Sequence, residues 1–263
     1  MKTINYLITG MAGILMTVMP LQAQNPGARE IMQKSRDVSK VKGMESVTQL
    51  CIVDAKGRER VRKITMASRD EGNVEKRIIK FLAPADVKGT GLLVFDYENK
   101  DDEMWLYLPA IRKTRKIVSS EKGKNFMGSE FSNADMAAPN LQDFTLKKLP
   151  DGQAEGVDCY RIEMTPLNAS LVREYGFAKK IVWIGKKDFV MRKAVYYDAD
   201  NEVHKVMTLG DIMELDPAHK KYLAREMTMV NKQNGRKSYI KMTQVQYRPD
   251  INPDYFTLSF LQR

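Results

Sequence analysis

The hydrophobic and polar positions of this chain follow the short alternating pattern of β-strands over most of its length. Apolar and β-branched runs are separated by turn-forming residues, as in residues 47–53 and 60–66 and again in residues 223–230 and 238–246. Asn234-Gly235, between the last two runs, is a strong short-range signal for a hairpin. The pattern predicts about eleven strands, the last over 255–261, in one antiparallel meander that forms a curled sheet or a barrel.

One predicted strand shows which side chains would share a face. Over residues 157–164, Tyr160, Ile162 and Met164 fall on one side and charged residues on the other, because successive side chains of a strand alternate. Residues 181–184 are instead apolar on both faces. A curled sheet covered by a helix and an ordinary sandwich would both contain such a strand.

Two segments are predicted to be helical. Pro26 fits the first turn of a helix that runs to Lys40 and carries a narrow apolar stripe. Residues 119–140 interrupt the strand pattern, and Ser132-Asn133-Ala134-Asp135 within them has capping-box character. We predict a short inserted helix there, which carries Phe131 and Met136 over a cavity mouth as a lid or plug.

The first residues have the features of a cleavable signal peptide. Lys2 provides a positive start, residues 7–19 form an apolar run, and Ala23 is a small residue at the expected cut. A membrane-spanning helix would need about 20 apolar residues, which is more than this run contains. We therefore expect residues 1–23 to be removed and residues 24–263 to form a single exported domain.

Charge and cysteine content narrow the range of partners. The formal net charge is +10, which favours acidic partners or anionic head groups, or serves solubility alone. Export argues against a nucleic-acid partner. The two cysteines, Cys51 and Cys159, both lie in strand-like segments, where cysteine often acts as a small apolar residue. We favour two buried thiols over a disulfide bridge.

The sequence assembles no catalytic or metal-binding constellation. Its only histidines are His204 and His219, and no GxSxG, HExxH, GxGxxG or Walker pattern occurs. Asp101-Asp102-Glu103 could bind a cation, but three adjacent acids between strands more often form a solvated turn. We therefore predict a protein that is not an enzyme and that uses neither a metal nor a cofactor.

Residues 104–136 are the best candidates for ligand binding. They combine methionine and aromatic residues, and methionine fills irregular space and adapts to ligands of variable shape. Such residues can equally fill an ordinary core, so their density favours a cavity in this region alone. The candidate cavity and lid residues are Trp105, Tyr107, Phe126, Met127, Phe131, Met136, Tyr160, Ile162, Met164 and Trp183.

A cluster of cations lies within the same region. Arg112, Lys113, Arg115 and Lys116 fall on both faces of a strand predicted over 112–118. Burying such a set unpaired would be prohibitive, so the strand lies at a sheet edge or its charges meet acidic partners. Cations protect edge strands against aggregation. The same cluster would also suit docking on an anionic membrane or an acidic protein, and both interpretations stay open.

Several motifs together point to one family. They are Trp105-Leu106-Tyr107-Leu108-Pro109-Ala110, the basic run Arg112–Lys116, Phe126-Met127-Gly128-Ser129, Phe131-Ser132, the strand pairs of 180–209 and Pro253-Asp254-Tyr255-Phe256-Thr257. In these motifs the chain resembles the LolA-like family of outer-membrane lipoprotein-sorting proteins. The resemblance covers most of the chain after residue 23. It implies an unclosed antiparallel β-barrel, mainly β, whose helices pack against its hollow, and a periplasmic protein of a Gram-negative bacterium.

Two functions are compatible with this resemblance. The first is a monomeric carrier that shields lipid or lipoprotein acyl chains and passes them between membranes, with an inner-membrane transporter or an outer-membrane acceptor as candidate partners. The second is a sensor or accessory module on the same fold, in which a bound ligand changes a contact with a membrane-protein partner. The lack of a catalytic constellation disfavours a lipid hydrolase.

Overall fold

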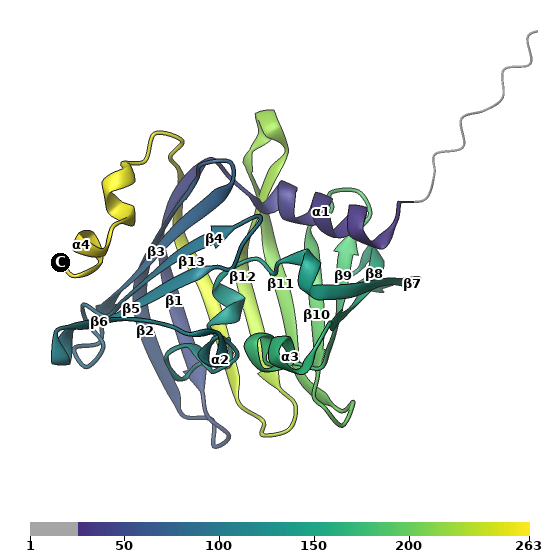
Figure 1. The fold of residues 1–263 in the computed structure, drawn as a ribbon, viewed down its shortest axis with the longest axis horizontal. Helices are drawn as coiled ribbons and strands as arrows, with labels where there is room; N and C mark the ends of the chain where they lie inside the picture. The colour runs from purple at the N-terminus through teal and green to yellow at the C-terminus, as the bar shows by residue number, and fades with distance from the viewer. Residues whose placement is uncertain (1–25) are drawn as a thin grey trace, which may run out of the picture.

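The strands of this protein form one continuous antiparallel sheet (Figure 1). A computed structural model describes residues 26–263, so the predicted signal peptide over 1–23 lies outside the described residues. Within that range the sheet has thirteen strands. They are β1 (Gly43–Val53), β2 (Glu59–Asp70), β3 (Val74–Ala83), β4 (Gly91–Tyr97), β5 (Glu103–Leu108), β6 (Lys113–Lys116), β7 (Phe144–Ala154), β8 (Val157–Pro166), β9 (Lys179–Gly185), β10 (Met191–Tyr197), β11 (Val203–Asp216), β12 (Lys221–Asn231) and β13 (Lys237–Tyr247).

The sheet is not closed, because its strand order runs from β6 at one edge to β7 at the other. The predicted class, an unclosed antiparallel barrel with helices, is confirmed. The described part has thirteen strands, where the pattern predicted about eleven.

Short helices complete the described part of the chain. The α-helices are α1 (Ala28–Ser39), α2 (Ser119–Lys122), α3 (Ala169–Tyr175) and α4 (Leu258–Leu261), and the 3₁₀ turns are η1 (Pro109–Ile111), η2 (Phe126–Gly128), η3 (Ala134–Met136), η4 (Leu141–Asp143), η5 (Pro217–His219) and η6 (Pro253–Phe256). The N-terminal helix is confirmed. Within the described range, no helix combines the length and the apolar character needed to cross a bilayer.

The strand predicted over 255–261 is wrong, since η6 and α4 occupy this segment. Two side-chain caps explain the difference. Asn252 Oδ1 accepts the backbone N–H of Asp254 at 2.9 Å, and Thr257 Oγ1 accepts that of Phe260 at 3.2 Å. These bonds satisfy the free N–H groups of a helix start, and the apolar alternation that suggested a strand serves packing against the sheet instead.

The hollow of the curled sheet is filled by side chains from three sources. The main apolar cluster joins inward residues of the strands to Ile31 and Met32 of α1 and to residues of the segment between β6 and β7. We call that segment, residues 117–143, the plug. It connects the two strands that form the free edges of the sheet, and Figure 1 shows α1, α2 and α3 in front of the curved sheet.

A second apolar cluster lies on the outer face of the sheet. Phe256 and Leu261 of the C-terminal segment pack there against Ile78 and Leu93. The C-terminal segment lies close to the sheet at Gly91, where a Cβ would stand 2.6 Å from Leu261 Cδ1. A larger residue at position 91 would therefore push this segment away. The C-terminal segment is therefore a strap on the outside of the barrel.

Both cysteines are free thiols, as favoured from the sequence. Cys159 is fully buried, whereas Cys51 is only partly buried, so the expectation of two buried thiols holds for Cys159 alone.

Candidate functional site

The structure brings seven of the ten candidate cavity residues together inside the curled sheet. Phe126, Phe131 and Met136 reach in from the plug, and Ile162 and Met164 from β8, and all five are buried in the main cluster. Met127 and Tyr160 pack against it. The predicted shared face of Tyr160, Ile162 and Met164 is confirmed. The interior is consequently apolar and is occupied by the plug.

The other three candidates lie on the outer face. Trp105 and Tyr107 belong to the cluster under the C-terminal strap. Trp183 lies on the outside of β9, with Arg161 and Lys193 each 5.2 Å from its ring centre. Strand alternation separates them from the interior, because inward positions are Met104 and Leu106 in β5 and Val182 and Ile184 in β9.

Charged side chains of the barrel wall hold the plug at Glu130. This residue is 1% exposed. Arg236 Nε lies 2.8 Å from its Oε1, Asn231 Nδ2 donates to its Oε2 at 3.0 Å, and Lys205 Nζ donates to its backbone carbonyl at 2.7 Å. A buried carboxylate with such partners is stabilised, while removing a partner would leave a costly buried charge.

Two arginines bind backbone carbonyls of the plug. Arg62 of β2 donates to Met127 O, and Arg77 of β3 donates to Met136 O. Arg236 adds a bond to Gly128 O at 2.9 Å. These bonds satisfy carbonyls that irregular backbone leaves without partners inside the barrel.

Asp135 anchors the plug on its other side. Ser132 N donates to Asp135 Oδ2 at 2.8 Å, and Asp135 N donates to Ser132 Oγ at 3.1 Å, so the predicted capping box is confirmed, although it caps a 3₁₀ turn. Tyr196 of β10 donates to Asp135 Oδ1 at 3.0 Å. Lys180 lies 4.5 Å from the Tyr196 ring. Burial lowers the pKa of Lys180, and the charge of Asp135 opposes that effect.

The far end of the plug meets a pair of wall carboxylates. Asp96, which is 2% exposed, accepts the backbone N–H of Ala138 at 2.7 Å and a bond from Arg36 of α1 at 2.8 Å. Burial, with the neighbouring charge of Asp96, raises the pKa of Asp102 to about 7. The sequence-based interpretation of Asp101-Asp102-Glu103 as a solvated turn is therefore wrong for Asp102, whose carboxylate accepts Tyr97 N at 3.2 Å.

This raised pKa predicts a measurable pH dependence of stability. An unfolded Asp ionises near pH 4, so folding favours the protonated form, and stability falls as pH rises from about 4 to about 7. Asp102→Asn, which keeps an oxygen acceptor for Tyr97 N, is expected to raise the melting temperature at pH 8 and to change it little at pH 4. Thermal melts of both proteins at the two pH values test this, and an equal shift at both would contradict it.

A polar cavity of about 260 Å³ adjoins the plug. Its lining includes Glu130 and Asp135 of the plug and His204, Lys205 and Arg236 of the wall. Burial lowers the pKa of His204, with Lys205 adding to the effect, so this imidazole is neutral at pH 7. The ionic contacts of the plug thus border space that a polar group or water can enter.

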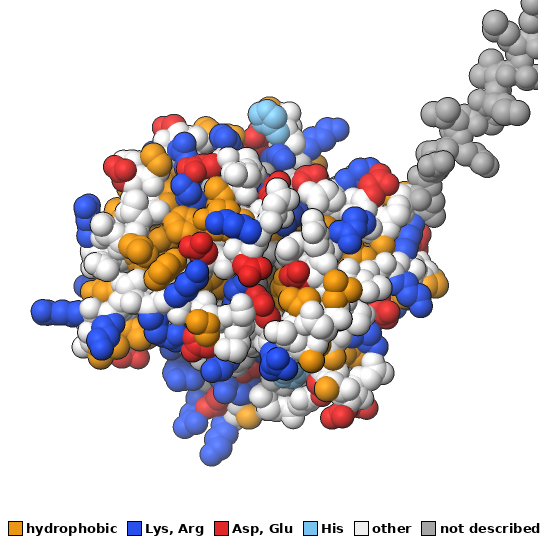
Figure 2. Space-filling model, in the orientation of Figure 1, with side chains coloured by type: hydrophobic (Ala, Val, Ile, Leu, Met, Phe, Trp, Pro, Cys, Tyr) orange, Lys and Arg blue, Asp and Glu red, His pale blue; other side chains and the backbone are white. Residues whose placement is uncertain are grey.

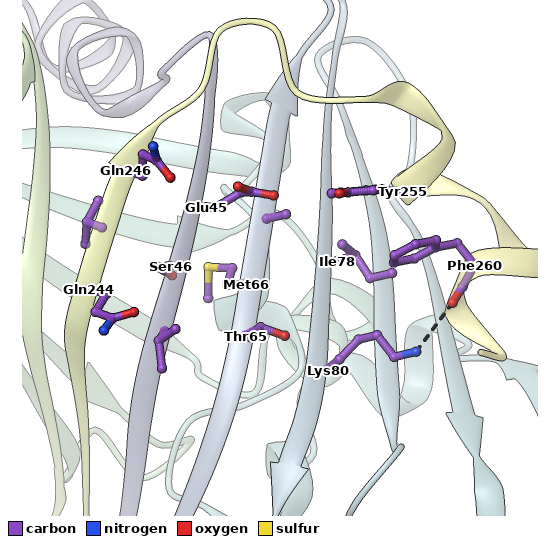
Figure 3. A pocket seen from close by; sticks show the side chains of 13 residues that line it. Glu45, Ser46, Thr65, Met66, Ile78, Lys80, Gln244, Gln246, Tyr255 and Phe260 are labelled. Atoms are coloured by element: carbon purple, nitrogen blue, oxygen red, sulfur yellow. Dashed lines mark hydrogen bonds between the residues drawn. The ribbon is translucent and has the colours of Figure 1, made fainter.

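A larger groove of about 630 Å³ lies on the outer face beside the strap (Figure 3). Its floor crosses β13, β1, β2 and β3, and Tyr255 and Phe260 stand along its strap side. Lys80 reaches the strap there and donates to Phe260 O at 3.4 Å. None of the ten candidate cavity residues lines it.

The predicted cation cluster lies on a free edge of the sheet. Its strand is β6, the edge strand, and Figure 2 shows Lys and Arg side chains protruding near β6 and the β1–β2 turn. Arg115 pairs with Glu121 at 2.6 Å, and Lys116 lies 5.7 Å from the Trp105 ring centre. Arg112 and Lys113 are exposed. Beside them Ile111 is 59% exposed.

Comparison with known proteins agrees with this architecture. A family model described as an uncharacterized protein matches residues 73–263, well over half of the chain. A solved structure described as an outer membrane lipoprotein-sorting protein domain from Vibrio parahaemolyticus is 25% identical with a TM-score of 0.80, over 89% of this chain and 97% of that one. The protein belongs to the LolA-like family.

Two further structures extend the likeness of this LolA-like protein. A DUF1329 family protein from Desulfovibrio piger is 25% identical with a TM-score of 0.80, over 89% of this chain and 97% of that one. A LolA superfamily protein from Nitrosomonas europaea, 17% identical with a TM-score of 0.68 over 90% of this chain and all of that one, shares the fold. No curated protein matches the sequence. The lipoprotein-sorting description of the Vibrio structure supports a carrier-type family.

Sequence reasoning missed the cations that face the interior. Arg62 precedes Ile64 and Met66 on the inward face of β2, and Lys205 precedes Met207 and Leu209 on that of β11. One sequence signal could have found them: a cation two residues before the apolar residues that share one face of a strand. In the described residues, no group of three or more His, Cys, Asp or Glu side chains could hold a metal ion.

Proposed function

We propose that this LolA-like protein carries the acyl chains of lipids or lipoproteins through the periplasm, within the interior that the plug fills. The observation that carries the proposal is the plug itself. Its buried side chains Phe126, Phe131 and Met136 occupy an apolar hollow, while polar contacts tie its backbone to the wall. Displacing the plug would exchange its side chains for a ligand of similar character.

The exchange explains how a carrier can bind and release. Burying an acyl chain contributes about 0.8 kcal/mol per CH₂. Exposing the apolar side chains of the plug to water costs a similar free energy for the same apolar area. Methionines line the hollow, among them Met164, Met207 and Met229, and their flexible thioethers adapt to different chains. Near balance between plug and ligand keeps the net affinity low enough for transfer, and no covalent step is needed.

Lipid content of the purified protein tests the proposal. Protein isolated from the periplasm of its source should show bound lipid or lipoprotein in native mass spectrometry. The variant Met207→Trp, which fills the interior, should lose most of that lipid. Val47→Trp, which places the same side chain in the outer groove, is the matched control and should retain it.

Other outcomes decide between the candidates. Lipid lost from Val47→Trp and kept by Met207→Trp would move the binding site to the outer groove. A protein that carries no lipid but forms a stable complex with a membrane protein would favour a sensor or accessory module instead. Melting temperatures of both variants confirm that each is folded.

A further inference from the structure

Five basic side chains of the described barrel wall share one property: each faces the interior and meets the plug. Arg62, Arg77, Lys180, Lys205 and Arg236 come from β2, β3, β9, β11 and the β12–β13 turn. Lys180 stands among apolar neighbours, since it pairs across the sheet with Met164 and Tyr196. An apolar hollow built only for acyl chains has no need of them.

The plug supplies most of the negative partners for these cations. Arg236 lies 2.8 Å and Lys205 3.8 Å from the carboxylate of Glu130. Asp135 supplies the negative charge near Lys180, and plug carbonyls receive Arg62 and Arg77. Two of the five also have a carboxylate outside the plug: Arg77 pairs with Glu75 at 2.7 Å, and the charge of Asp86 lies near Arg62.

Opening of the plug would therefore leave the buried Lys180 and Lys205 and the partly exposed Arg236 without the plug carboxylates. A desolvated charge is costly unless a counter-charge or hydrogen-bond acceptors compensate it. A hydrocarbon chain replaces Phe131 and Met136 but offers nothing to Lys205 or Arg236. The polar cavity of about 260 Å³ beside Glu130 gives a head group a place next to both cations.

We propose that the cargo is an amphiphile with an anionic phosphate or carboxylate head group, whose oxygens replace the Glu130 carboxylate between Lys205 and Arg236. This inference rests on the proposed carrier function and specifies its cargo. The plug thus imitates the ligand twice, with apolar side chains for the tail and Glu130 for the head. Arginine suits this task, since its donors match phosphate and carboxylate geometry.

Competition within one membrane tests the preference. Mixed vesicles with equal parts of phosphatidylglycerol and phosphatidylcholine, of identical acyl chains, are incubated with the protein, and the lipids that stay with it after gel filtration are quantified by mass spectrometry. Because both lipids share one vesicle, the docked protein meets both, and the control variant below accounts for attraction by surface cations. Hydrogen bonds to a charged group contribute about 1.5–3 kcal/mol, so wild type should take up the anionic lipid at least roughly tenfold more than the neutral one.

Matched variants locate the preference. Glu130→Gln/Lys205→Gln/Arg236→Gln removes both signs of charge together, so no buried charge is left alone, and it should take up the two lipids nearly equally. Glu202→Gln/Lys187→Gln/Lys237→Gln removes one anion and two cations from exposed positions, the same change in net charge, and should keep the preference. The single variant Arg236→Gln, which changes the partly exposed cation of this cavity, should lower the ratio in the same direction.

The outcomes separate this inference from the carrier function. Equal uptake of the two lipids by wild type would overturn the anionic head group and leave the carrier intact. Uptake of neither lipid would overturn both. A third arm uses inorganic phosphate alone, with chloride at equal ionic strength. If phosphate raised the melting temperature as much as phosphatidylglycerol does, the cations would serve a free anion, and the lipid cargo would be wrong.

Discussion

Glu130→Ala is expected to lower the free energy of unfolding by about 3–5 kcal/mol, because it leaves the buried Lys205 and the partly exposed Arg236 without their carboxylate. Glu130 is 1% exposed and meets Arg236, Asn231 and Lys205. In a domain of this size the loss corresponds to a fall in melting temperature of roughly 6–20 °C. Urea titration and thermal melts measure it.

Hydrogen exchange identifies the region that Glu130→Ala destabilises. If the plug opens as a unit of its own, amide exchange should rise across residues 117–143 while the central strands β1 and β13 stay protected. Glu202→Ala, at an exposed turn position, is the control and should change stability by less than about 0.5 kcal/mol. A loss below about 1 kcal/mol for Glu130→Ala would mean that its ion pairs do not hold the plug.

The sequence predicted the architecture well because strand alternation and turn chemistry are local. Residues 157–164 had the correct inward face, and the capping box at Ser132 and Asp135 formed as expected. The cost of burying the cations predicted either an edge strand or acidic partners. Both occur, since β6 is an edge strand and Arg115 pairs with Glu121. The C-terminal strand failed because capping by Asn252 and Thr257 outweighed alternation.

The site was harder to predict, because its composition depends on contacts between distant segments. Trp105 and Tyr107 resemble cavity residues in the sequence, yet the alternation of side chains along β5 places them on the outer face. Glu130 shows no local signal, since its partners Lys205 and Arg236 lie more than seventy residues away. Only the fold brings these charges into one place, and the plug that joins them lacks a regular pattern.

Removal of the unpaired edge cations is expected to weaken binding to anionic vesicles roughly hundredfold. Arg115 is paired with Glu121 at 2.6 Å, which leaves Arg112, Lys113 and Lys116 for docking. Each basic residue near an anionic membrane contributes about 1 kcal/mol, so Arg112→Gln/Lys113→Gln/Lys116→Gln loses about 3 kcal/mol. The exposed Ile111 beside them favours a lipid surface over an acidic protein, because an apolar tip can enter the interface.

Vesicle sedimentation at low and physiological salt measures this binding. The control Lys187→Gln/Lys220→Gln/Lys237→Gln removes the same net charge from exposed positions elsewhere, so it corrects for the overall charge of +10. If both triple variants bind equally, general attraction explains docking and the β6 cations only protect the sheet edge. Weaker binding of the β6 variant alone would assign docking to that edge, where the chain leaves the sheet to enter the plug and membrane contact could bear directly on plug opening.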